Sequence, residues 1–302
     1  MIAEKLITKL AHDEGFDLVG VVRVEPMDEE RKRFEEWLAA GNGSTLSYLE
    51  RNIEKRFDAA KLVEGAESII VCGVSYLSPY SRGYSKETRH KIASYALARD
   101  YHLTIKEMLG HLAEALKQHY PTLRYRAFTD SAPLAEKSLA ARAGFGWIGR
   151  HSLVVNPTFG SMFLLGELVI DKAVDNYSSP MQGVGCGSCN ACIEACPNST
   201  ILDNRLIDTR RCVSCRTIER EGCDEHITFD GWIFGCDACQ SACPFNRHAP
   251  LHTNPLFDPL FDPTAVDWRD LTPEEFAAMA GTTPLTRAGL ERLRHNAQVE
   301  DR

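Results

Sequence analysis

Membrane-spanning and secretory segments are missing from this chain of 302 residues. The first twenty residues are too polar to contain the apolar region of a signal peptide, and no run approaches the roughly 18 apolar residues that a membrane helix needs. Low-complexity segments are missing as well, and so are internal repeats beyond the paired cysteine runs described below. We therefore expect an ordinary globular protein of the cytoplasm, monomeric and without a membrane partner.

The chain has no excess of positive charge. It carries 34 Lys and Arg residues against 42 Asp and Glu residues, a formal net charge of −8. Because counterion release from phosphates requires clustered Lys and Arg, this balance argues against broad, non-specific binding of nucleic acid. Two local basic segments, 205–220 and 287–294, could each contact an RNA or form an ordinary solvated face.

Cysteine, in contrast, is plentiful and concentrated. Ten of the eleven cysteines lie within residues 186–243. Disulfides are rare in the cytoplasm and an odd number of cysteines weakens a disulfide framework further, so metal ligation explains them better. Residues 186–197 read Cys-x2-Cys-x2-Cys-x3-Cys-Pro, and residues 236–244 read Cys-x2-Cys-x3-Cys-Pro. Two such runs are typical of a ferredoxin-like module with two 4Fe-4S clusters, whereas a single CxxC pair would favour zinc.

The spacing also predicts how the ligands are divided between the clusters. In this pattern the last cysteine of each run binds the opposite cluster. One cluster would take Cys186, Cys189, Cys192 and Cys243, and the other would take Cys196, Cys212, Cys236 and Cys239. Spacing alone leaves the choice between Cys212 and Cys215 open, and the unused one is surplus together with Cys223. Cys72 lies in an apolar run and is expected to be a small buried residue.

Helical and strand-like patterns alternate before residue 175. Periodicity predicts helices over 2–14, 28–40, 103–119 and 133–143, and strands over 16–22, 68–76, 124–128 and 162–170. This alternation indicates a mixed α/β (α+β) layer domain over residues 1–175. A segment rich in Ser, Pro and Gly, 176–185, marks the boundary to a cluster domain over 176–250. Residues 251–302 predict a short helical tail, with helices near 273–280 and 286–296.

Seven further segments match one family. They are NIEKR at 52–56, SYALARDYH at 94–102, TDSAP at 129–133, AGFGWIGRHS at 143–152, GSMFLLGE at 160–167, RCVS at 211–214 and FGCDACQSACP at 234–244. Through these segments, which span nearly the whole chain, the sequence resembles the epoxyqueuosine reductases, cobalamin-dependent iron-sulfur enzymes of tRNA queuosine maturation. The family's cysteine in Arg-Cys-x-Ser implies that Cys212 is the remaining cluster ligand. Many relatives continue into a C-terminal helical-repeat domain that helps to hold tRNA, so the chain resembles a short form with a smaller or different RNA contact.

The resemblance implies a specific reaction. The family reduces the epoxide of epoxyqueuosine in a tRNA anticodon loop to the alkene of queuosine, and releases the oxygen as water. A low-potential donor such as ferredoxin or flavodoxin would supply electrons, which the clusters would pass to cobalamin. Asp130 is implied as the proton donor, although its local sequence suits a helix N-cap equally well. Because an ordinary Asp is ionised at pH 7, the acid role predicts that burial against the corrin face and the substrate raises its pKa.

Cobalamin is expected to bind without a protein histidine on cobalt. The nearest approach to the Asp-x-His-x-x-Gly pattern, around His226, lacks the final glycine. The resemblance implies cofactor contacts from Arg56, Ala93, Asp130, Val154, Leu165 and Ser214, each of which could instead be a packing or surface residue. A Gly-x-Gly-x-x-Gly pattern at 144–149 follows a predicted helix rather than a strand, so we assign it to tight turns and not to a dinucleotide site.

Two other functions stay open at this stage. One is a reductive dehalogenase-like corrinoid enzyme, a class that also combines cobalamin with two 4Fe-4S clusters but usually carries an export signal. The other is a non-enzymatic, ferredoxin-type electron carrier whose N-terminal domain only docks partners. Cobalamin binding would argue against the carrier, and turnover of an organohalide without tRNA would favour the dehalogenase.

Overall fold

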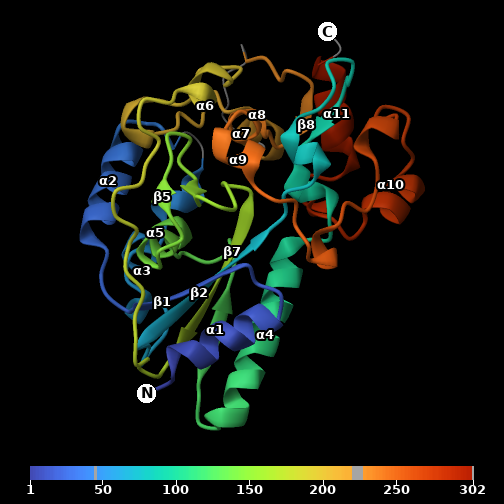
Figure 1. The fold of residues 1–302 in the computed structure, drawn as a ribbon. Coiled ribbons are helices and arrows are strands. Elements are labelled where there is room, and N and C mark those ends of the chain that lie inside the picture. Colours follow the sequence, from blue (N-terminus) through green and yellow to red (C-terminus); the bar gives the residue numbers. More distant parts are fainter. Residues whose placement is uncertain (44–45, 220–226, 301–302) are drawn as a thin grey trace.

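A computed structural model describes residues 1–43, 46–219 and 227–300 of the chain (Figure 1). Its helices are α1 (Glu4–Asp13), α2 (Asp28–Ala39), α3 (Ile53–Arg56), α4 (Tyr101–His119), α5 (Glu136–Arg142), α6 (Ala191–Glu194), α7 (Val213–Ile218), α8 (Ala238–Ser241), α9 (Pro244–His248), α10 (Pro273–Ala280) and α11 (Leu290–Glu300). Its strands are β1 (Leu18–Arg23), β2 (Ser68–Ser75), β3 (Lys91–Ile92), β4 (Tyr125–Phe128), β5 (Trp147–Ile148), β6 (Val154–Val155), β7 (Phe163–Ile170) and β8 (Trp232–Phe234). Within these described ranges, no helix is both long and apolar enough to cross a membrane.

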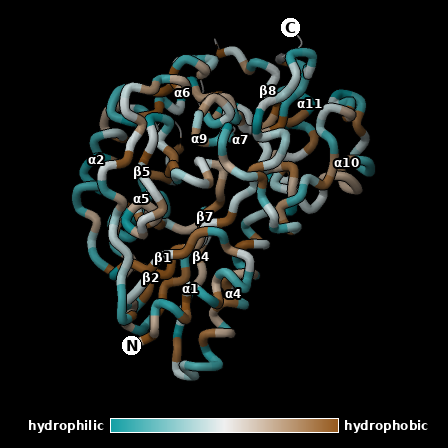
Figure 2. Tube along the Cα trace, viewed as in Figure 1, coloured by the Kyte–Doolittle hydropathy of each residue, from teal (hydrophilic) through white to brown (hydrophobic). Residues whose placement is uncertain are grey.

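A four-stranded antiparallel sheet, in the order β1-β2-β7-β4, organises the first part of the chain. All eight residues of β2 are buried, because helices cover both faces of the sheet. Ile70 and Cys72 pack in the core formed with α1 and α4, while Ile69 and Val71 pack in the core formed with α5. This division follows from the two-residue period of a strand. Figure 2 shows the strands as the hydrophobic centre of this layer.

The mixed α/β architecture and the elements predicted before residue 175 are confirmed, with one difference in α5. The helix predicted over 133–143 begins only at Glu136, and its N-cap is Ala135, which makes no side-chain capping bond. Asp130 lies before this helix in the left-handed backbone conformation, with φ at 54°. Asp130 is therefore not the N-cap that its local sequence suggested.

The cysteine-rich segment consists of short helices that begin close to cysteines. Cys212 is the N-cap of α7 and Cys243 is the N-cap of α9. Helix α8 contacts both α6 and α9, so the two cysteine runs lie side by side. The short helices thus bring cysteines that are distant in sequence into one region.

The C-terminal tail shares a core with the two preceding parts of the chain. Strand β3 pairs in parallel with β8, and α11 packs on β8. The resulting core contains Ile92 from β3, Phe234 from β8 and Trp268, which is fully buried in the tail. The boundaries predicted at 175 and 250 stay a prediction, but this core does not divide at them. A small segment gains stability from such sharing, because alone it buries little apolar surface.

We expect a Trp268→Ala substitution to destabilise this shared core. The indole is fully buried and its Nε1–H donates to the carbonyl oxygen of Pro263 at 3.2 Å, so truncation leaves a large cavity and an unpaired acceptor. The free energy of unfolding should fall by about 3 to 5 kcal/mol. Urea denaturation under anaerobic conditions measures the change. Leu260→Ala, at a side chain that is 52% exposed, is the matched control and should change it by less than about 0.5 kcal/mol; equal effects would contradict the prediction.

Candidate active site and cluster centres

Hydrogen bonds to two different elements, β7 and α5, fix the turn that contains Asp130. Asp130 follows β4, and Asp is one of the few non-glycine residues that adopts left-handed φ readily. On one side, Thr129 donates its hydroxyl to the carbonyl oxygen of Leu165 in β7 at 2.8 Å. On the other, the backbone N–H of Asp130 donates to Oε1 of Glu136 in α5 at 2.5 Å. The position of the Asp130 carboxylate therefore depends on both the sheet and the helix.

The first turn of α4 supplies the partners of the Asp130 carboxylate. The Tyr101 hydroxyl donates to Oδ2 of Asp130 at 2.7 Å, and Nε2 of His102 lies 2.9 Å from the same oxygen. On its other side, Nδ1 of His102 lies 2.7 Å from Oδ1 of Asp100, which also caps α4 by accepting from the His102 backbone N–H. An imidazole between two carboxylates can donate to both only when both of its nitrogens carry protons.

These contacts determine the charge state of the Asp130 carboxyl in the chain alone, and the raised pKa expected against a corrin and substrate stays a prediction. The hydrogen bond from His102 holds the pKa of the Asp130 carboxyl below its ordinary value, and the bond from Tyr101 acts in the same direction. Burial opposes this effect but does not prevail, since the side chain keeps 55% of its surface accessible. The chain by itself therefore favours an ionised Asp130 that is already hydrogen-bonded to a proton carrier, His102.

Two other carboxyl groups near Asp130, those of Glu136 and Glu167, have raised pKa values. Burial, together with the negative charge of Asp130, raises the pKa of Glu136 to about 7. Burial and the adjacent Glu136 raise the pKa of Glu167 well above its ordinary value. Sequence reasoning missed both residues and also missed Tyr101 and His102. The available signal was a single charged residue, Glu167, in a strand that is otherwise apolar.

Residues from the tail and from the cluster segment also approach Asp130. Arg287, at the end of a 3-10 helix (Pro284–Arg287), lies 3.8 Å from Asp100 through its Nε, and its charge helps to lower the pKa of Asp130. The pKa of Tyr48 is raised to about 12, first by burial and then by the nearby charges of Glu219 and Asp130. Asp130 therefore lies where the layer domain, the cluster segment and the tail meet.

The division of the cluster cysteines into two sets stays a prediction, and the cysteines of each predicted set lie near one another. Cys192 lies in electrostatic range of Cys186, Cys189 and Cys243. Cys239 lies in range of Cys196 and Cys212, and also of Cys192 from the other predicted set. Cys236 in turn lies near Cys212 and Cys239. In the described ranges no three such side chains are close enough to chelate a single metal ion. The donor set fits a cubane, in which each thiolate binds a different iron atom.

Hydrogen bonds reach sulfurs of both predicted sets. Nε1–H of Trp147 in β5 donates to Sγ of Cys186 at 3.3 Å, and the backbone N–H of Thr200 donates to Sγ of Cys196 at 3.3 Å. Donors to cluster sulfurs stabilise the reduced, more negative state and are one of the ways in which a protein sets the reduction potential. The remaining predicted alternative, Cys215, lies within α7. Cys223 and His226 lie outside the described residues.

The residues assigned to cobalamin by resemblance lie in two neighbouring groups. Leu165 is bound to the Asp130 turn through Thr129, and Val154 packs in the core that Leu165 borders. Arg56 lies at the end of α3, where its buried Nε has no hydrogen-bond partner among the described residues.

The second group lies near the second cysteine set. Ala93 packs with Val213 beside Cys236, and Ser214 follows Val213 at the start of α7. An unpaired guanidinium nitrogen together with apolar side chains fits a large amphipathic ligand such as a corrin.

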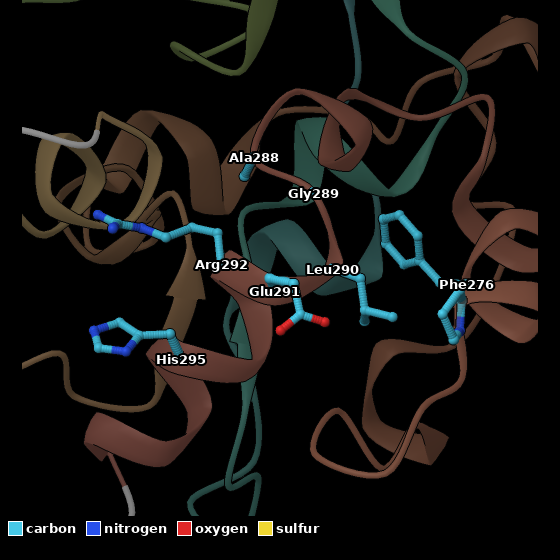
Figure 3. A pocket seen from close by; sticks show the side chains of 8 residues that line it. Phe276, Ala288, Gly289, Leu290, Glu291, Arg292 and His295 are labelled. Carbon is cyan, nitrogen blue, oxygen red and sulfur yellow. The ribbon is translucent and has the colours of Figure 1, made fainter.

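A hollow of about 700 Å³ in the tail is a separate feature (Figure 3). Phe276 and Leu290 line it on one side, and Arg292 and His295 lie toward the other. None of the residues predicted for catalysis, cobalamin or the clusters is among its lining residues. The candidate active site is therefore defined by the side chains around Asp130 rather than by this hollow.

A layered α/β domain that presents an acid–imidazole pair beside two sets of cluster cysteines defines an iron-sulfur oxidoreductase. A family model described as "Epoxyqueuosine reductase QueG, DUF1730" matches residues 56–131, and one described as "4Fe-4S double cluster binding domain" matches residues 185–246. An epoxyqueuosine reductase of Cyclobacterium marinum is 36% identical over 97% of this chain and 94% of its own length. That of Escherichia coli K12 is 33% identical over 94% of this chain and 77% of its own length.

The chain belongs to the epoxyqueuosine reductase family, and the resemblance found in the sequence is confirmed. It is an oxidoreductase, an epoxyqueuosine reductase of queuosine biosynthesis that contains a 4Fe-4S double-cluster domain.

Solved structures of the family share the fold. The epoxyqueuosine reductase of Streptococcus thermophilus, 29% identical, superposes with a TM-score of 0.85 over 98% of this chain and 80% of its own. A crystal structure of epoxyqueuosine reductase with a tRNA-Tyr epoxyqueuosine-modified stem loop, 24% identical, superposes with a TM-score of 0.87 over the same shares.

Proposed function

We propose that this chain reduces epoxyqueuosine to queuosine in the anticodon loop of tRNA, with electrons that two 4Fe-4S clusters pass to cobalamin and with Asp130 as the proton donor. The observation that carries the proposal is the Asp130 carboxylate, bound to His102 and Tyr101 and placed between the layer domain and the cysteine sets. A relative crystallised with an epoxyqueuosine-modified tRNA stem loop supports the substrate.

Conversion of the epoxide to an alkene and water consumes two electrons and two protons. When bound, cobalamin supplies a strongly nucleophilic metal centre that the clusters reduce in one-electron steps. The residues proposed to hold it are Arg56, Ala93, Asp130, Val154, Leu165 and Ser214. The eight cysteines of the two sets hold the clusters in this proposal.

The chain's own residues would handle the protons. Asp130, once protonated, donates to the substrate oxygen and returns to the ionised state that its hydrogen bonds favour. His102 lies 2.9 Å from Asp130 and 2.7 Å from Asp100, so it can pass a proton to Asp130 and receive another from the Asp100 side. Tyr101 keeps the accepting oxygen in place. Asp130 can therefore serve both proton transfers in turn.

The partners follow from the same proposal. Arg205, Arg211 and Arg216 fall in the first basic segment and Arg287, which pairs with Asp100, begins the second; we propose that these segments contact tRNA phosphates. A low-potential donor such as ferredoxin or flavodoxin would reduce the clusters. We propose a monomer that works in the cytoplasm.

The test is direct conversion of the tRNA nucleoside. Anaerobically purified, cluster-replete protein is incubated with cobalamin, a low-potential reductant and epoxyqueuosine-containing tRNA, and the digested nucleosides are analysed by mass spectrometry. We expect conversion to queuosine that depends on added cobalamin. Intact clusters and bound cobalamin without conversion would refute the substrate assignment, and turnover of an organohalide would then support the dehalogenase alternative.

A further inference from the structure

Two glutamates, one from α5 and one from β7, lie next to the Asp130 turn. Glu136 begins α5, and Glu167 lies in β7, opposite Phe128 of β4 and Val71 of β2. Glu167 is fully buried, and its side chain lies within hydrogen-bond reach of Glu136. No N–H or O–H donor in the described part of the chain reaches either Glu167 oxygen. Glu136 in turn accepts the backbone N–H of Asp130.

Two carboxyl groups can form such a contact only when one of them carries a proton. Two buried carboxylates would repel each other and leave their oxygens unsolvated, whereas an acid and a carboxylate share a strong, charge-assisted hydrogen bond. The surrounding charges do not offer an alternative. Lys137, whose charge favours the ionised form of Glu136, donates its ammonium group to the carbonyl oxygen of Ser152. Val71, opposite Glu167 in β2, is apolar, and Asp130 adds further negative charge.

We propose that a protonated Glu167 donates a hydrogen bond to Glu136. This pair, called the latch below, holds the backbone N–H of Asp130, so that the Asp130 carboxylate keeps its hydrogen bonds to His102 and Tyr101. The inference rests on the proposed role of Asp130 and names Glu136 and Glu167 as positioning residues for it. Asp tolerates the left-handed φ of 54°, and the bond from its backbone N–H to Glu136 fixes this conformation of the turn. A buried glutamate in an apolar strand is costly, and this role explains why the strand carries one.

The latch is expected to respond to pH. The pair shares one proton, which lies on Glu167, and burial and the adjacent Glu136 raise the pKa of Glu167 well above its ordinary value. A raised acid pKa means that the proton is held below this pKa and lost as the pH rises through it. Above this pKa, the two facing carboxylates repel each other. The Asp130 turn is then held less firmly, and kcat falls. KM for tRNA should change little, because neither glutamate is exposed to a substrate.

The experiment compares three variants of the cluster-replete, cobalamin-loaded protein. Glu167→Gln keeps a donor for Glu136 but cannot titrate, Glu167→Leu removes the donor at similar size, and the exposed Glu274→Gln is the matched control. We expect Glu167→Leu to lower kcat about 100-fold, the loss typical of a misplaced catalytic group. Glu167→Gln should retain much more activity than Glu167→Leu and should lose the alkaline decline. Glu274→Gln should keep the wild-type pH profile.

A second measurement does not depend on turnover. The infrared spectrum of the wild type should contain a band of a protonated, buried carboxyl group that is absent from the spectrum of Glu167→Gln. Hydrogen exchange of the Asp130 amide should be faster in Glu167→Leu than in the wild type. An unchanged band, or unchanged amide exchange, would overturn the latch. If the wild type fails to convert epoxyqueuosine while the band and the exchange behave as expected, the latch stands and the proposed function fails.

Discussion

An Asp130→Asn variant is expected to lose turnover of epoxyqueuosine-containing tRNA by about 100- to 10,000-fold, the range that removal of a general acid costs. Asparagine can still accept from Tyr101 through its amide oxygen and has nearly the same size, so the turn after β4 should persist. It cannot deliver a proton to the substrate oxygen. The rate of queuosine formation, measured with saturating tRNA, gives the effect on kcat.

The controls for Asp130→Asn separate chemistry from cofactor loss. Iron content, the absorbance of the clusters and the amount of bound cobalamin should all match those of the wild type. Asp270→Asn, an exposed aspartate in the tail, should leave the rate unchanged. An Asp130→Asn variant that retains near-wild-type turnover would show that another group donates the proton.

A Cys212→Ala variant is expected to lose one of the two clusters. Cys212 is the N-cap of α7 and lies in electrostatic range of Cys236 and Cys239, which is where the fourth ligand of the second set has to be. Without its fourth thiolate the second cluster should not assemble, so iron and sulfide should fall to about half of the wild-type content. Turnover should fall below detection, because the one-electron route is interrupted.

Cys215→Ala is the matched control for this prediction. Cys215 lies in the same short helix and is the alternative that cysteine spacing could not exclude. The variant should keep the full iron content and near-wild-type turnover. The opposite pattern, with iron lost in Cys215→Ala and retained in Cys212→Ala, would show that Cys215 is the ligand. The implication drawn from the family resemblance would then be wrong.

The sequence by itself determined the parts of this protein that depend on local patterns. The cysteine spacing predicted a double-cluster domain, and a matching family model confirms that coarse assignment. Continuous apolar runs predicted β2 and β7, because a strand covered on both faces has to be apolar throughout. The segments quoted for the resemblance identified the family, because they contain uncommon residue combinations along nearly the whole chain.

The assignment of site residues could be made only in part. Asp130 was named by resemblance, but local sequence favoured a capping role for it and burial suggested a raised pKa. In the chain alone, His102 and Tyr101 from α4 lower the pKa of Asp130, and the raised pKa expected against corrin and substrate stays a prediction. Sequence distance conceals such contacts, because the charge state of a carboxyl group depends on the donors that surround it rather than on its neighbours along the chain.

Only the tertiary structure decided which distant residues act together. Antiparallel pairing of β7 with β2 and β4 places Glu167 behind Asp130, and the packing of α5 adds Glu136. The tail, which its sequence presents as a pair of short helices, joins the core of β3 and β8 and brings Arg287 to Asp100. Local patterns determined the elements and the kinds of ligand, whereas burial and long-range pairing determined which side chains meet, because those contacts arise only once the layers have packed.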